Sequence, residues 1–167
     1  MVVVYKARLF SVERKKCTYK GRRFVFDNII GPDTVAVLPI LGDGSIILEK
    51  QYRYTIGKSI YEVPAGHMDK GENPKEAAAR ELKEETGYDA KSIKYIFSAY
   101  VAPGTKTEMQ HYFIAKDLEK GKTNREPDEF IRIVKVSVAD ALAMIENKSI
   151  IDLKTIALLL FFSRSRT

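Results

Sequence analysis

The segment from residue 66 to residue 88, GHMDKGENPKEAAARELKEETGY, constrains the fold of this chain more than any other. Asn73 is a residue type that accepts hydrogen bonds at the start of a helix, and Glu76 follows three positions later, where it can close a capping box. Pro74 stands at the first helical position, where its missing N–H costs nothing. Gly87 can end the helix in a left-handed conformation. We therefore predict a capped helix over residues 74–86.

Three carboxylates are grouped on this predicted helix. Glu81, Glu84 and Glu85 stand at positions i, i+3 and i+4, which places them on neighbouring parts of the helix surface. Like charges at this spacing repel, and the last helical turn also disfavours anions. A bound divalent cation would reverse both penalties, since Mg²⁺ prefers oxygen ligands. The pattern indicates a metal-binding helix, and a solvated acidic helix is the alternative.

The same segment resembles the signature of the Nudix family, G-x5-E-x7-R-E-(apolar)-x-E-E-x-G-(apolar). Every fixed position is matched, and the matching residues are Gly66, Glu72, Arg80, Glu81, Leu82, Glu84, Glu85, Gly87 and Tyr88. The resemblance implies an α/β fold, the Nudix α/β/α sandwich with a mixed β-sheet, preceded by a small N-terminal antiparallel sheet.

Five shorter features resemble the ADP-ribose pyrophosphatase group within this family. They are Q-Y-R at 51–53, E-V-P-A-G at 62–66, a proline at 103, D-E-F-I at 128–131 and I-D-L-K-T-I at 151–156. Each is weak by itself, but together they extend the resemblance over residues 34 to 160.

The resemblance implies a role for the carboxylates of the helix. Glu81 and Glu85 would be the main ligands of Mg²⁺, or of Mn²⁺, with Glu84 assisting and the Ala65 carbonyl oxygen as a backbone ligand. Arg80 would organise these carboxylates and so contribute to catalysis.

The general base is expected outside the helix. The resemblance places it on a late acidic loop, where we assign it to Glu129, with Asp128 and Glu126 as the alternatives. A solvated loop without a catalytic role is the other interpretation of these three residues.

Substrate contacts are expected from the shorter features. The resemblance implies that Arg53 and Glu62 bind the nucleotide end, and that Pro103 and Gly104 also contact the substrate. Arg53 could instead, or in addition, pair with Glu62 across adjacent strands. Pro103 and Gly104 could simply form a turn.

The chain divides at a break over residues 28–33, which contains a Gly-Pro pair. Residues 1–30 alternate in the manner of two or three antiparallel strands, and residues 31–167 would form the Nudix domain. Members of this group are commonly homodimers whose N-terminal strands help to build the partner's site, so we expect a homodimer. In the second part, the predicted strands cover 34–41, 45–54, 59–63, 93–101, 109–115 and 130–138, the later helices cover 137–147 and 152–163, and a polar loop covers 117–128.

Length and composition agree with a globular protein that has one sizeable core. The chain has 167 residues and a net charge of +6, which suits an anionic substrate. Nucleic acid is not expected, because the basic residues are scattered in small groups. Cys17 is the only cysteine and no apolar run is long enough to span a bilayer, so we expect a cytoplasmic protein that does not enter membranes.

The function that follows is metal-dependent hydrolysis of the pyrophosphate bond of ADP-ribose to AMP and ribose 5-phosphate. Two alternatives stay open. One is a Nudix hydrolase of another nucleoside diphosphate derivative, such as a nucleotide sugar, a dinucleoside polyphosphate or capped RNA. The other is a non-catalytic sensor of ADP-ribose, which the complete set of four signature glutamates disfavours.

Overall fold

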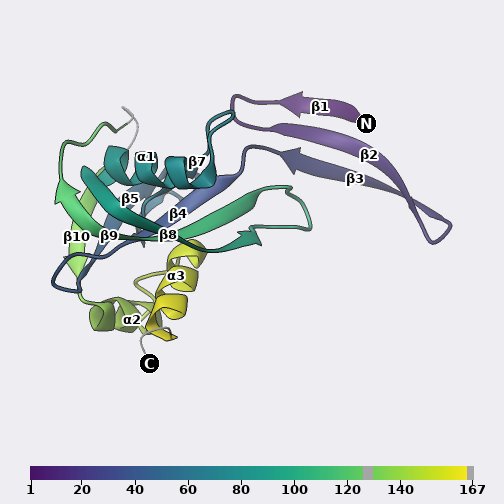
Figure 1. Ribbon diagram of the computed structural model, residues 1–167. Coiled ribbons are helices and arrows are strands. Elements are labelled where there is room, and N and C mark those ends of the chain that lie inside the picture. Colours follow the sequence, from purple (N-terminus) through teal and green to yellow (C-terminus); the bar gives the residue numbers. More distant parts are fainter. Residues whose placement is uncertain (126–129, 165–167) are drawn as a thin grey trace.

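The computed structural model describes residues 1–125 and 130–164 (Figure 1). The strands are β1 (Val2–Lys6), β2 (Ser11–Tyr19), β3 (Arg22–Ile30), β4 (Thr34–Pro39), β5 (Ile46–Arg53), β6 (Lys58–Glu62), β7 (Ala65–His67), β8 (Tyr88–Tyr100), β9 (Met109–Lys120) and β10 (Ile131–Val136). The helices are α1 (Pro74–Thr86), α2 (Val138–Glu146) and α3 (Leu153–Arg164), and a short 3₁₀ helix covers Tyr54–Ile56. None of the helices in these two ranges is long and apolar enough to cross a membrane.

A mixed four-stranded sheet forms the centre of the molecule. Its order is β7-β4-β9-β8, with β4 parallel to β9 and the other pairs antiparallel. Alternate residues of β4 point to opposite faces, so Val35 and Val37 pack with Leu82 of α1, whereas Leu38 packs with Leu158 of α3. Helices therefore cover both faces, and the predicted α/β/α sandwich with a mixed sheet is confirmed (Figure 1).

A second, three-stranded sheet of order β10-β5-β6 stands beside the mixed sheet. Both neighbours of β5 run antiparallel to it. The first residues of β5 are buried, while its last residue, Arg53, is partly exposed. This sheet places Arg53 near the start of α3, and Lys154 of α3 contacts Glu62 of β6.

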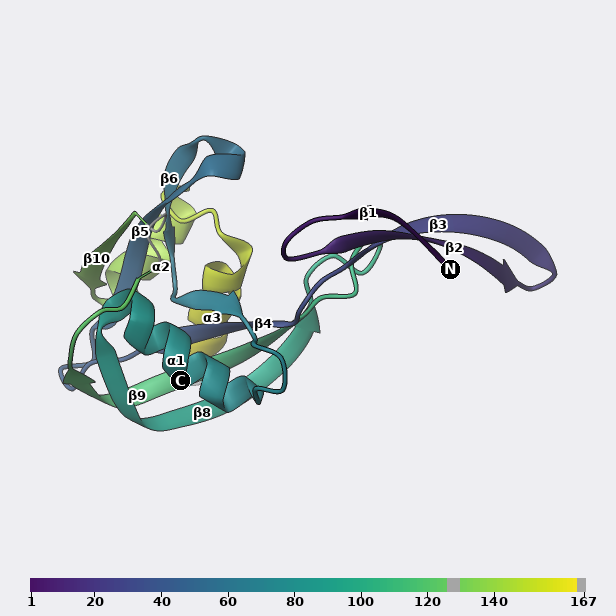
Figure 2. The same ribbon diagram turned by 90° about the horizontal axis from the view of Figure 1, so that it is seen from above.

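The N-terminal sheet, of order β1-β2-β3, projects from the rest of the molecule (Figure 2). Its attachment includes bonds to the turn between β8 and β9, from Ile29 N to Thr105 O (2.8 Å) and from Thr107 N to Ile29 O (3.2 Å). Residues 1–30 hold eight basic and two acidic residues, which account for the whole net charge of +6. The small antiparallel sheet predicted before the Nudix sandwich is confirmed.

Strands β8 and β9 are longer than the sequence indicates. The polar segment predicted as a loop from residue 117 in fact continues β9 to Lys120, and β8 begins at Tyr88 rather than at residue 93. The two extensions pair with each other, and Leu118 and Ala90 pack against the α1 side of the core. This cross-strand pair of apolar residues faces the core, which helps to hold the otherwise polar ribbon on the sheet.

Helix α1 begins and ends as its sequence predicts. The Asn73 side chain accepts hydrogen bonds from the backbone N–H groups of Lys75 and Glu76, and Glu76 completes the capping box. Gly87 has a φ of 77°, the left-handed conformation that stops the helix. These caps fix where the helix ends, and therefore where its carboxylates lie.

Candidate active site

A cleft of about 1360 Å³ is lined by residues of both the three-stranded sheet and the mixed four-stranded sheet. Its walls come from β5, β7, α1, the start of α3 and the β8–β9 hairpin, and the turn after β1 reaches its rim. The predicted site residues that line it are Arg53, Ala65, Arg80, Glu81, Glu84 and Glu85. The structure thus brings the carboxylates of α1 and the arginine of β5 to one cavity.

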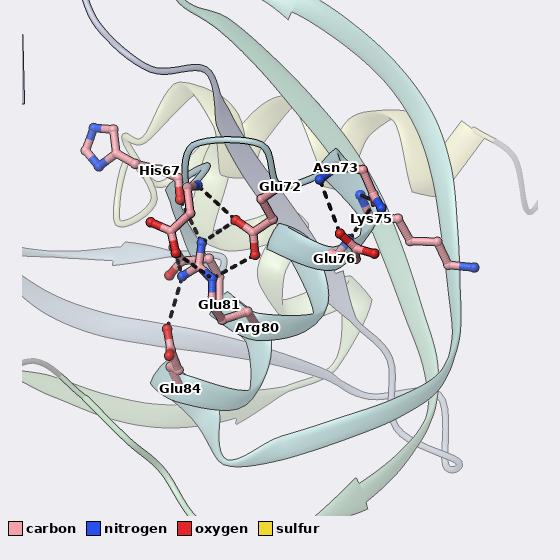
Figure 3. Close-up of polar contacts among 9 residues, drawn as sticks. His67, Glu72, Asn73, Lys75, Glu76, Arg80, Glu81 and Glu84 are labelled. Atoms are coloured by element: carbon pink, nitrogen blue, oxygen red, sulfur yellow. Dashed lines mark hydrogen bonds and ion pairs between the residues drawn. The ribbon is translucent and has the colours of Figure 1, made fainter.

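Arg80 is the centre of a polar cluster on α1 (Figure 3). Its Nη1 donates to Glu81 Oε1 at 2.8 Å and to Glu84 Oε2 at 3.1 Å. Its Nε and Nη2 form a bidentate pair with Glu72 at 2.9 and 2.8 Å, and Nη2 also donates to the His67 carbonyl at 2.9 Å. The hydrogen bond to Glu72, above all, raises the pKa of Arg80, so this cation is permanent.

The Arg80 cluster offsets the charge of two of the three carboxylates on this helix, Glu81 and Glu84. A fixed positive charge between Glu81 and Glu84 offsets the repulsion expected at their spacing. Glu72 comes from the loop before the helix, and the hydrogen bond from Arg80 holds the pKa of Glu72 below its usual range. This loop is thereby fixed to the helix surface.

The Glu81 carboxylate fills the space that a side chain on residue 66 would need. Glu81 is 8% exposed. A Cβ added to Gly66 would overlap the Glu81 carboxylate carbon and both its oxygens. Gly66 lies on β7, which is paired with β4, so its backbone is held in place by the sheet. Glycine is therefore required here to let the carboxylate lie against the strand.

Glu85 connects α1 to the same strand. Its Oε2 accepts a hydrogen bond from the Ala65 N–H at 2.9 Å, and the residue is 3% exposed. A buried carboxylate is stabilised only when it is paired or hydrogen-bonded. The contact fixes Ala65, the predicted backbone ligand, beside the predicted side-chain ligand.

The donors present suit a hard divalent cation. Three carboxylates and a backbone segment with carbonyl oxygens line one cavity, which is the ligand chemistry of Mg²⁺. In residues 1–125 and 130–164, however, no three acidic, His or Cys side chains stand close enough to form a complete ligand group. The Arg80 Nη1 atom lies between the Glu81 and Glu84 oxygens instead.

The C-terminal end of α1 is closed by the segment after β9. Asn124 N donates to the Glu84 carbonyl at 3.0 Å, and Arg125 Nε donates to the Glu85 carbonyl at 2.7 Å. Arg125 Nη1 also donates to the Ile131 carbonyl at 2.9 Å, which links α1 to β10. A cation at this helix end is favourable because the helix dipole is negative there.

The Arg125 contact was not predicted, although the sequence holds a signal for it. A helix ending in two glutamates needs a nearby cation, but spacing alone does not identify which one. The predicted base Glu129 and its alternatives, Asp128 and Glu126, follow directly in the chain. They lie outside the described residues, so the assignment of the base stays a prediction.

Arg53 pairs with Glu62, which was one of the two interpretations of this arginine. Arg53 Nε and Nη2 donate to the two Glu62 oxygens at 2.7 and 2.8 Å. Lys154 contacts the same carboxylate and also Asp152, at 3.0 Å. Burial works to raise the pKa of Glu62, but its bonds to Arg53 and the charge of Lys154 hold it below the ordinary value.

Glu62 is enclosed behind this pair. It is buried and is not among the cleft residues, whereas Arg53, Asp152 and Lys154 are. Lys154 lies in the segment 151–156, whose resemblance to the ADP-ribose pyrophosphatase group did not imply a role for this lysine. Glu62 and Lys154 are 92 positions apart in the chain, so no local pattern of the sequence indicates their contact.

Removing the Glu62 charge should destabilise the fold in a pH-dependent way. Glu62→Gln is expected to lower the free energy of unfolding at pH 7 by about 3 kcal/mol, since two cations lose a buried partner. Because the folded pKa of Glu62 lies below its ordinary 4.5, the contribution is complete above that pH and is lost as the pH falls through the folded pKa. Urea unfolding at several pH values measures the difference.

The matched control for this experiment is Glu146→Gln, which changes an exposed carboxylate on α2. It should alter the free energy of unfolding by less than about 0.5 kcal/mol at every pH. A difference between wild type and Glu62→Gln that widens on acidification would contradict the ion-pair assignment.

Pro103 and Gly104 are exposed in the turn between β8 and β9. The turn is closed by hydrogen bonds from Thr105 N and Lys106 N to the Ala102 carbonyl, at 2.9 and 2.8 Å. In the single chain, the described residues that line the cleft do not include Pro103 or Gly104. The turn interpretation therefore describes their local structure, and substrate contact by these residues stays a prediction.

Comparison with known proteins identifies the class to which this fold and cleft belong. A sequence model of the NUDIX domain matches residues 32–159. The chain is 42% identical over 126 residues to an ADP-ribose pyrophosphatase of Bacillus subtilis (strain 168), covering 74% of this chain and 68% of that protein. It is 39% identical over 127 residues to a methanol dehydrogenase activator of Bacillus methanolicus, covering 75% and 69%.

Two further similarities extend the comparison. A GDP-mannose pyrophosphatase of Yersinia enterocolitica serotype O:8 / biotype 1B (strain NCTC 13174 / 8081) is 36% identical over 126 residues, covering 70% of this chain and 65% of that protein. The crystal structure of an ADP compounds hydrolase matches with a TM-score of 0.87 and 25% identity, covering 98% of this chain and 89% of that chain. At that coverage, the match includes nearly all of the N-terminal sheet.

The chain belongs to the Nudix family. Within the family, it is a Nudix pyrophosphatase, as the signature and the shorter features predicted.

Proposed function

We propose that this enzyme hydrolyses the pyrophosphate bond of ADP-ribose to AMP and ribose 5-phosphate. The observation that carries the proposal is the set of carboxylates from α1 that line one cleft together with Arg53. The similarity to the Bacillus subtilis ADP-ribose pyrophosphatase and to the ADP compounds hydrolase supports the choice of substrate.

In this proposal Glu81, Glu84, Glu85 and the Ala65 carbonyl hold divalent metal, Mg²⁺ or Mn²⁺. The bound metal would neutralise pyrophosphate charge and lower the pKa of a water molecule. Arg80 keeps the Glu81 and Glu84 carboxylates in position.

The remaining roles fall to residues outside the helix. Glu129 accepts the proton of the attacking water, and Arg53 and Glu62 orient the nucleotide, Glu62 by holding the Arg53 guanidinium. Pro103 and Gly104 contact the substrate from the β8–β9 turn. The single cysteine, Cys17, agrees with a cytoplasmic location.

A nucleotide sugar is the second candidate substrate, because the chain is also 36% identical to GDP-mannose pyrophosphatases. Dinucleoside polyphosphates and capped RNA are further possibilities within the same class of reaction. A non-catalytic sensor is disfavoured, since all four signature glutamates are present and three of them line the cleft.

A substrate panel tests the proposal. With Mg²⁺ present, ADP-ribose should be hydrolysed with a kcat/KM at least about tenfold above that of GDP-mannose, diadenosine polyphosphate or capped RNA, which corresponds to about 1.4 kcal/mol. Products are measured by chromatography, and chelation should abolish turnover. Faster turnover of GDP-mannose would reassign the substrate, and no metal-dependent turnover of any compound would overturn the enzymatic function.

We also propose a homodimer formed through the N-terminal sheet. Large apolar side chains of this sheet are exposed in the single chain, among them Val4, Tyr5, Phe24, Val25 and Phe26. An exposed apolar surface of this kind marks an interaction site. The turn after β1 also lines the cleft through Arg8 and Leu9.

Light scattering tests the dimer. The wild-type chain should have twice the 18.9 kDa mass of one chain, and Phe26→Glu should reduce the mass to that of one chain. Lys94→Glu, an exposed change on β8, is the control and should stay dimeric. A wild-type mass of 18.9 kDa at the assay concentration would contradict the dimer.

A further inference from the structure

Both glutamines of the chain are buried in the wall of the cleft. Gln51 lies on β5 and Gln110 on β9, and they are 6% and 7% exposed. Glutamine is mostly an exposed residue type, and a buried amide needs hydrogen-bond partners. Their shared location therefore calls for an explanation in terms of what enters the cleft.

Gln110 is held in one orientation by its neighbour. Its Oε1 accepts a hydrogen bond from the Tyr112 hydroxyl at 2.9 Å, and the Tyr112 ring is stacked on Phe97 with the ring centroids 4.3 Å apart. Burial raises the pKa of Tyr112, so the hydroxyl stays a donor. Within the described residues, the amide nitrogen of Gln110 has no hydrogen-bond partner.

Gln51 is less constrained. Its side chain makes no hydrogen bond to any residue in the ranges 1–125 and 130–164. It stands two residues before Arg53 on the same strand, so both side chains face the same side of that strand. The free amide thus lies on the side of β5 that carries the Arg53–Glu62 pair.

Several of the charged side chains of the cleft already have partners. Arg53 and Lys154 bind Glu62, and Lys106 lies 3.3 Å from Glu108. The two amides are neutral, and an amide offers both a donor and an acceptor. A hydroxyl group offers the same pair of functions, whereas a phosphate offers only acceptors.

We propose that Gln51 and Gln110 bind the hydroxyl groups of the sugar that is attached to the nucleoside diphosphate, and so determine which sugar is accepted. This inference rests on the proposed function, and it adds a specificity subsite to it. Sites built to hydrogen-bond a substrate hydroxyl discriminate strongly against analogues that lack it, because their buried polar groups are then left unpaired.

The test uses the near-isosteric variants Gln51→Met and Gln110→Met. Each should lower kcat/KM for ADP-ribose about tenfold, mainly through KM. Each should lower kcat/KM less than about twofold for an ADP ester that carries a butyl group in place of the terminal ribose, since the lost hydrogen bonds are absent there. The control is Asn147→Met, which replaces an exposed amide at the end of α2. It should leave kcat/KM unchanged for both substrates.

Calorimetric binding of ribose 5-phosphate gives a readout that does not need turnover. Wild type should bind it at least about fivefold more tightly than either variant. Equal losses on both ADP substrates, or unchanged ribose 5-phosphate binding, would overturn the subsite. Failure of wild type to hydrolyse any ADP compound would instead overturn the proposed function, and the binding comparison would still decide the role of the glutamines.

Discussion

Replacing Glu85 by glutamine is expected to lower kcat for ADP-ribose about a thousandfold or more, which corresponds to about 4 kcal/mol of transition-state stabilisation. The substitution keeps the shape of the side chain and an oxygen for the Ala65 N–H, but it removes a negative charge from the cleft. A hard divalent cation binds carboxylates far better than amides, so metal affinity should fall as well. Steady-state kinetics and Mn²⁺ binding followed by electron paramagnetic resonance measure the two effects.

The fold of this variant should be intact. Its melting temperature should stay within about 5 °C of wild type, because the hydrogen bond to β7 is retained. Glu119→Gln, on the exposed end of β9, removes the same charge away from the cleft and should leave kcat unchanged. Near-normal turnover of Glu85→Gln would refute its assignment as a metal ligand.

Replacing Gly66 by alanine, which adds a single methyl group, should cause the second largest loss of activity after Glu85→Gln. In Gly66→Ala the new Cβ overlaps the Glu81 carboxylate, and the strand that carries it is fixed by pairing with β4. Glu81 must therefore move, and a displacement of about 1 Å at a reacting centre costs about a hundredfold in rate. We expect kcat/KM to fall by about that factor, measured under the same conditions as for Glu85→Gln.

Gly42→Ala is the matched control for this substitution. No atom lies within 4 Å of the position that its Cβ would take, so the variant should have wild-type kinetics. If Gly66→Ala were as active as Gly42→Ala, the position of the Glu81 carboxylate against β7 would have no importance for catalysis.

Local sequence signals predicted the bounds of helix α1 well. Asn73, Pro74, Glu76 and Gly87 act over a few residues, and the hydrogen bonds they make are found where their spacing places them. The signature also implied the α/β/α sandwich, which alternation of apolar residues alone does not specify. Features that depend on residues a few positions apart, such as the helix caps, could therefore be predicted from the sequence.

Contacts between distant segments could not be predicted in the same way. Glu76 and Arg80 stand four positions apart on α1, a spacing that allows an ion pair, but Glu76 closes the capping box and Arg80 binds Glu72 from the preceding loop. Lys154 reaches Glu62 across 92 residues, and no periodicity reports such a contact. These partners are determined by how distant elements pack against one another, and the spacing of residues along the chain carries no information about that packing.

The uneven charge of the molecule has an electrical consequence. Residues 31–167 hold twenty basic and twenty acidic residues, so the excess of positive charge belongs to the projecting N-terminal sheet. A neutral body with a cationic extension has a large permanent dipole moment, which orients the molecule in the field of an approaching anion. The isoelectric point of about 9.3 is therefore a property of one appendage, and the enzyme core by itself is close to isoelectric at neutral pH.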